Sequence, residues 1–139
     1  MKVSGFRPLA VCGNDASSVR DRFLDIQQLH ADPNFCVKCI SGGTQPATRG
    51  HILGQLHELA NGADPESRLI FFYSGHGVRL QHKGADEFFL VPEDAFSGTN
   101  VDALISFPLA TEILNKSAAK EHSWARSIHQ HRGSEPCFD

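Results

Sequence analysis

A histidine between two glycines, directly after a block of apolar residues, is the feature of this sequence best suited to chemistry. Residues 69–73 are all apolar or aromatic, and Ser74-Gly75-His76-Gly77 follows at once. Functional groups of open α/β sheets gather beyond the carboxyl ends of the strands, and an imidazole there can exchange protons near neutral pH. The glycines leave room for a sharp turn or a close backbone approach. The stretch predicts a general acid or base at His76; the alternative is a loop histidine between two turn glycines.

The elements that must position this histidine follow an α/β order. Three amphipathic helices are predicted, over residues 15–30, 47–60 and 107–120. Thr48 and Pro108 stand where helices commonly begin. Three strands are predicted, over residues 35–40, 69–73 and 87–91. The strand at 69–73 is apolar throughout, as in a central strand covered on both faces, so we expect an α/β fold.

Length and composition indicate one ordinary globular domain. The chain has 139 residues, of which 40% are hydrophobic and 21% charged, and its net charge is −3. Its 13 basic residues are scattered, which argues against binding to nucleic acid. No apolar run approaches the roughly 20 residues of a membrane span, and the N-terminal stretch is a poor signal peptide. We therefore expect no membrane partner and a cytoplasmic location.

Four cysteines leave the redox chemistry open. Cys36 and Cys39 form a C-x-x-C within a strand-like run, and neither a second pair nor a thioredoxin-like setting accompanies them. Two reduced strand cysteines are the favoured interpretation, with a metal or redox pair as the alternative. Cys12 alone is typical of a core residue. Cys137 lies two residues from the end, after a proline.

The last part of the chain has a different character. Residues 121–139 show neither helical nor strand periodicity and contain three of the histidines, His122, His129 and His131. These histidines lack a closed set of zinc ligands. We expect one domain over residues 1–120 and a disordered tail over 121–139.

Several segments resemble the caspase-like cysteine peptidases, above all the metacaspases and their bacterial relatives. The segments are "CGNDASSVRDRFL", "ATRGHILGQLHELA", "LIFFYSGHG" and "DEFFLVPEDA", which follow one another within residues 9–116. "YSGHG" after an apolar strand is the most specific of them. The resemblance implies an incomplete caspase-like three-layer sandwich, with a mostly parallel sheet and helices on both faces, acting on a polypeptide substrate.

The resemblance also implies roles for individual residues. His76 would be the histidine of a Cys–His dyad, and the backbone N–H of Gly77 would contribute to the oxyanion hole. Cys12, Asp15 and Ser74 would shape an acidic pocket for Arg or Lys at the cleavage site, since a carboxylate pairs well with a cation. Without the family, Asp15 would be interpreted as an acidic residue favoured at a helix N-terminus.

The thiol that such a histidine should activate is not found where the family carries it. After residues 107–120 the family continues into a strand that ends in Asp-x-Cys, and no such run follows here. Cys137 is interpreted as a bystander. We expect this isolated chain to be inactive, or to be a non-catalytic caspase-like module that binds or regulates a protein partner. An unrelated α/β domain remains the third hypothesis.

No cofactor is predicted. Metacaspases that need calcium carry an acidic pair near the start of a helix, and Ser106 and Phe107 stand about where those acids would fall. Asp86, Glu87 and Asp94 offer hard oxygen ligands, but carboxylates on surface loops are usually only solvated.

Overall fold

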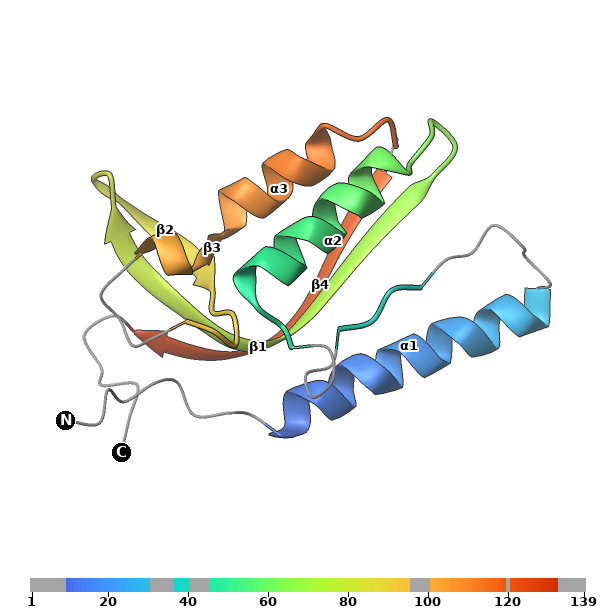
Figure 1. Ribbon diagram of the computed structural model, residues 1–139, viewed down its shortest axis with the longest axis horizontal. Helices are drawn as coiled ribbons and strands as arrows, with labels where there is room; N and C mark the ends of the chain where they lie inside the picture. The colour runs from blue at the N-terminus through green and yellow to red at the C-terminus, as the bar shows by residue number, and fades with distance from the viewer. Residues whose placement is uncertain (1–9, 31–36, 41–45, 96–100, 120, 133–139) are drawn as a thin grey trace.

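The computed structural model describes residues 10–30, 37–40, 46–95, 101–119 and 121–132; for residues 10–14, 30 and 121–132 it describes the backbone. Its helices are α1 (Ala10–His30), α2 (Arg49–Asn61), α3 (Phe107–Asn115) and a short 3-10 helix, η1 (Val101–Ala103). Its strands are β1 (Arg68–His82), β2 (Ala85–Leu90), β3 (Ile105–Ser106) and β4 (Glu121–Arg132). The four strands form one sheet in the order β3-β2-β1-β4 (Figure 1).

The sheet is mixed. β1 pairs antiparallel with β2, and β2 pairs antiparallel with β3, whereas β1 and β4 run parallel. A two-residue loop joins β1 to β2, and its residues Lys83 and Gly84 both have positive φ, 52° and 79°. Such loops match the twist of antiparallel strands. The expectation of a mostly parallel sheet is therefore not confirmed in the described part of the chain, because this hairpin takes the place of a crossover.

Helices cover both faces of β1. Successive side chains of a strand point to opposite faces. Leu69, Phe71 and Tyr73 belong to or pack against the cluster that α2 and α3 share. Ser74 points the other way, to α1, with which it forms a hydrogen bond. The expected arrangement of helices on both faces is thus present around this strand, with α1 on one side and α2 and α3 on the other (Figure 1).

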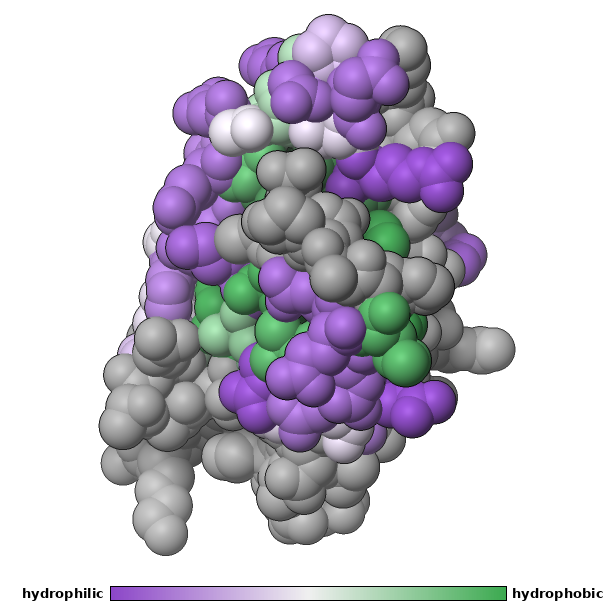
Figure 2. All heavy atoms as spheres, turned by 90° about the vertical axis from the view of Figure 1, so that its right-hand side faces the viewer, coloured by the Kyte–Doolittle hydropathy of each residue, from purple (hydrophilic) through white to green (hydrophobic). Residues whose placement is uncertain are grey.

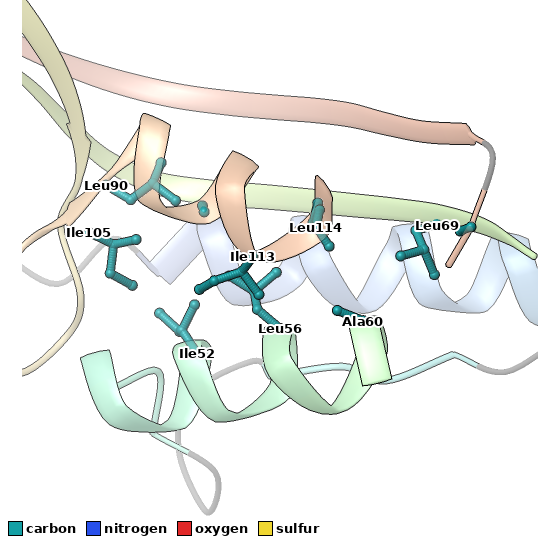
Figure 3. Packing of buried hydrophobic residues seen from close by; sticks show 10 residues of the cluster. Ile52, Leu56, Ala60, Leu69, Leu90, Ile105, Ile113 and Leu114 are labelled. Atoms are coloured by element: carbon teal, nitrogen blue, oxygen red, sulfur yellow. The ribbon is translucent and has the colours of Figure 1, made fainter. Parts of the chain in front are cut away.

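The main hydrophobic core lies between α2, α3 and the sheet. Figure 3 shows Ile52 and Leu56 of α2 facing Ile113 of α3, with Leu69 of β1 near one end and Leu90 and Ile105 near the other. All of these side chains are 6% exposed or less. A second, smaller cluster forms where β1 and β2 meet the segment after β2, and its buried members are Val78, Phe89, Val91, Ala95 and Leu104. The first cluster holds β1 and β2 against α2 and α3, and the second holds the hairpin against the segment after β2 and the residues around η1.

Two of the helices begin as their sequences predict. The hydroxyl of Thr48 accepts a hydrogen bond from the backbone N–H of His51 and caps α2. The hydroxyl of Ser106 does the same for α3 by accepting from the N–H of Leu109, and Pro108 stands in the first turn. α3 ends at Asn115 rather than at the predicted residue 120.

The first helix differs more from its prediction. It begins at Ala10, not at residue 15, and its predicted apolar stripe is only partly covered. Two residues of this stripe, Ile26 and Leu29, are 44% and 81% exposed. Leu24, elsewhere on α1, and Ile70 of β1 are also exposed. Apolar surface is visible between polar side chains at this end of the molecule (Figure 2). The stripe is amphipathic in sequence, but the sheet it faces covers only part of it.

Two other segments also differ from expectation. Residues 37–40, predicted as part of a strand, have no regular secondary structure. Cys39 there is half-buried and free, and Cys36 lies outside the described residues. Residues 121–132 form strand β4, where we expected the start of a disordered tail. Backbone hydrogen bonds to β1 order this segment, although its side-chain pattern does not predict a strand. Residues 133–139, with Cys137, lie outside the described residues.

Candidate active site

β1 does not end where the Ser74-Gly75-His76-Gly77 motif begins. The strand continues from Arg68 through Ser74-Gly75-His76-Gly77 to His82. The sequence predicted that the strand ends at residue 73, before glycines that permit a turn or a close backbone approach, and this predicted end is wrong. His76 therefore lies within a strand and is half-buried. Its side chain projects from a continuous, hydrogen-bonded segment.

Gly75 is required for a reason that the sequence did not indicate. A Cβ at Gly75 would lie 2.6 Å from Oη and 2.8 Å from Cζ of Tyr73. Residues i and i+2 of a strand share a face, and here the phenol ring fills the space beside the glycine. The missing side chain makes room for Tyr73 and not for a turn.

We expect Gly75→Ala to destabilise the protein by about 1–3 kcal/mol, because the added methyl group forces the tyrosine ring out of its packed position. Gly54→Ala is the matched control. Gly54 is exposed within α2, and nothing lies within 4 Å of a Cβ built there. This control should gain about 0.5–1 kcal/mol, since alanine favours a helix over glycine. Urea unfolding of both variants measures the two effects; a loss of the same sign and size in both would contradict the account of Gly75.

Asp15 and Ser74 meet although 59 residues separate them. The hydroxyl of Ser74 donates a hydrogen bond of 2.8 Å to Oδ2 of Asp15, which lies in α1. Ser74 and His76 are two residues apart on the same strand face, so Asp15 lies on the face that carries the histidine. All three residues are half-buried. The Asp15 carboxylate and the His76 side chain thus lie on one face of β1, and the Ser74 hydroxyl holds the carboxylate there.

For the other predicted site residues, the structure gives only the backbone position or the strand partner. Cys12 lies in α1, one turn before Asp15; its side chain is outside the described set. Gly77 is buried and pairs with Leu90 of β2. Cys137 lies outside the described residues. The structure thus brings Asp15, Ser74 and His76 to one face and leaves the thiol partner unplaced.

The carbonyl oxygen of His76 is held by two donors. The backbone N–H of Val91 donates to it at 3.0 Å, and the hydroxyl of Tyr73 lies 2.9 Å from it. The same hydroxyl lies 3.0 Å from the carbonyl oxygen of Val91. Sequence reasoning missed Tyr73, because an aromatic residue in an apolar strand is typical of a core.

The acidic segment after β2 anchors α2. Oε2 of Glu93 accepts a hydrogen bond from the N–H of Ala47, and Oδ1 of Asp94 accepts one from the N–H of Arg49, both at 2.9 Å. The N–H of Glu93 donates to the carbonyl of Ala47. Carboxylates satisfy the unpaired N–H groups at a helix start and suit its dipole. These contacts join the segment that follows Val91 to the helix N-terminus.

No metal cluster is formed by these acids in the described part of the chain. No group of three or more histidine, cysteine, aspartate or glutamate side chains there could hold an ion. Asp94 is engaged at α2, and Asp86 accepts a hydrogen bond from Gln81 across the hairpin. Ser106, at the position considered for a calcium ligand, caps α3. Among the described residues, no helix is long and apolar enough to cross a membrane.

β4 lies where a parallel neighbour of the histidine strand would be expected. It pairs with β1 from Arg68↔Glu121 to Arg79↔Arg132, and His129 is the register partner of His76. Residues 121–132 contain no cysteine. A strand is therefore present beside the histidine, but its sequence does not supply the nucleophile.

The sheet and its covering helices are consistent with part of a caspase-like domain, and comparison with known proteins gives the family. The family model for the metacaspase, peptidase C14 domain, matches residues 3–105. This chain belongs to that family. It is 37% identical over 82 residues to Metacaspase-1 of Cryptococcus neoformans var. neoformans serotype D, in strain JEC21 and equally in strain B-3501A. Each match covers 57% of this chain but 18% and 17% of the two relatives, so the chain spans a small part of their length.

Proposed function

We propose that this chain carries the histidine half of a cysteine endopeptidase that cleaves after Arg or Lys. Membership in the metacaspase family supports the reaction class. The observation that carries the residue assignment is the hydrogen bond between Ser74 and Asp15 on the face of His76. In such a peptidase the imidazole accepts the thiol proton, the thiolate attacks the scissile carbonyl, and the imidazole returns the proton to the leaving amine. The N–H of Gly77 would help to stabilise the oxyanion where its contact with β4, opposite Gln130, gives way to the substrate.

Asp15 is proposed as the specificity residue. A half-buried carboxylate that is already oriented by the Ser74 hydroxyl keeps further acceptor lone pairs for a guanidinium or ammonium group. Cys12, one helical turn before it, would line the same pocket. The pocket would then select Arg or Lys by charge and would leave uncharged side chains without a partner for the carboxylate.

We further propose that the isolated chain does not turn over substrate. β4 carries no cysteine beside His76, and a Cys–His peptidase needs a thiolate within reach of the imidazole. The second candidate function follows from the same observation: a non-catalytic caspase-like module that binds or regulates a polypeptide partner through the proposed acidic pocket for Arg or Lys.

Binding of an arginyl peptide tests the pocket without requiring turnover. An acetylated peptide that ends in an Arg residue is titrated into the chain and followed by amide chemical shifts. We expect binding that is weakened about tenfold or more in Asp15→Asn, because a charge-assisted hydrogen bond is lost. Asp21→Asn is the control, since Asp21 is an exposed residue of the same helix that pairs with Arg20. Equal affinity in Asp15→Asn and the original chain would refute the assignment of Asp15.

A fluorogenic substrate with Arg at the cleavage position then separates the two functions. We expect no turnover above the buffer rate under reducing conditions. Turnover that disappears in His76→Ala and in Cys137→Ser would overturn the inactivity proposal and would make Cys137 the nucleophile. Turnover that survives Cys137→Ser would exclude that cysteine.

A further inference from the structure

We propose that Tyr73 is a positioning residue for the proposed active site, and that its hydroxyl fixes the backbone from which His76 and Gly77 project. The inference rests on the proposed function of these two residues. It concerns Tyr73, which stands in the motif of the resemblance but to which the resemblance assigns no function.

The hydroxyl of Tyr73 binds both β1 and the residue that follows β2. Its oxygen lies 2.9 Å from the carbonyl of His76 and 3.0 Å from the carbonyl of Val91. A phenol has one proton to donate, so the two carbonyls share it. The N–H of Val91 donates to the His76 carbonyl as well, at 3.0 Å. Three groups thus converge where the β1–β2 ladder ends, since β2 stops at Leu90.

The ring of Tyr73 has little freedom to leave this position. It packs against the main hydrophobic cluster, and it occupies the space beside Gly75 so closely that a Cβ there would meet its oxygen at 2.6 Å. Core packing fixes the ring, and the ring fixes the hydroxyl. Gly75 therefore contributes to the position of the tyrosine hydroxyl, because it leaves the space that the ring occupies.

Tyr73 and Val91 hold the peptide group between His76 and Gly77, which carries the proposed chemistry. The carbonyl of His76 is bonded to the N–H of Gly77 through one planar peptide group. Fixing that carbonyl consequently fixes the direction of the Gly77 N–H, the proposed oxyanion donor. It also fixes the Cα of His76, from which the imidazole extends on the face shared with Ser74. Positioning within about 0.5 Å is what such a site requires.

The test uses Tyr73→Phe, which removes the hydroxyl and keeps the ring. The readouts are amide hydrogen exchange at Val91 and Gly77 and the imidazole ¹H–¹³C resonances of His76, and neither needs turnover. We expect exchange at Val91 to become at least tenfold faster and the His76 resonances to shift. Amides of α2 should keep their rates. Thr111→Val is the matched control, because it removes a comparable hydroxyl–carbonyl hydrogen bond, to Phe107 in α3.

Gly75→Ala provides a second variant that displaces the hydroxyl by a different route. It should reproduce the changes at Val91 and His76, and Tyr73→Phe combined with it should add little. Unchanged Val91 exchange and unchanged His76 resonances in both variants would overturn the proposal. So would a uniform acceleration of exchange throughout the chain, which would indicate a global packing role. If arginyl peptide fails to bind while these local changes occur, the proposed function fails and the positioning role stands.

Discussion

Removal of residues 121–139 is expected to destabilise the chain severely and to drive it into aggregates. Residues 68–79 of β1 pair with β4 along their whole length, so the deletion exposes the backbone donors and acceptors along one edge of β1. Long, unprotected strand edges template pairing with other chains. Size-exclusion chromatography and a thermal unfolding curve of the shortened chain measure the effect.

The control for this deletion removes residues 133–139 alone and leaves β4 in place. This control measures any effect of removing residues 133–139 by themselves. The longer deletion also decides between strand and tail for residues 121–132. If the chain without 121–139 stays monomeric and unfolds at the temperature of the full chain, the segment contributes no pairing and behaves as a disordered tail.

Leu56→Ala is expected to cost about 2–5 kcal/mol of unfolding free energy. Leu56 is 2% exposed and lies in the cluster shared by α2, α3 and the sheet. A truncated leucine at such a site loses its transfer free energy and leaves a cavity that its neighbours fill only in part. Since a loss of 1 kcal/mol lowers the midpoint of a domain of this size by about 4 °C, thermal unfolding would detect the change readily.

Leu24→Ala is the matched control for this substitution. Leu24 lies on α1 and is 39% exposed, so its truncation should cost well under half as much. Equal losses in the two variants would mean that α1 is packed as tightly as α2. That result would contradict the partial exposure of Leu24.

Much of the local structure could be predicted from the sequence. Thr48 and Pro108 marked the starts of α2 and α3, because capping hydroxyls and a first-turn proline act within one helical turn. The apolar run at 69–73 indicated a strand for a similarly local reason, since every side chain there is apolar. The motif "YSGHG" with its flanking segments indicated the peptidase family, which the family model confirms over residues 3–105.

The candidate site was only partly predictable. The resemblance named Asp15 and Ser74, and the structure joins them by a hydrogen bond. It gave no indication of Tyr73, whose role depends on where Val91 arrives. The glycines were misinterpreted, because the same residue serves a turn or a close side-chain approach. Only the position of the phenol ring distinguishes the two.

The sequence by itself determined the types and approximate places of α2, α3, β1 and β2 and the family to which the chain belongs. Those features depend on capping, periodicity and residue types that act over a few positions. The tertiary structure alone decided that β1 continues through His76, that Asp15 meets Ser74, and that residues 121–132 pair with β1. These features depend on contacts between distant segments, and a backbone ladder forms with any neighbour that presents its donors and acceptors, whatever its side chains.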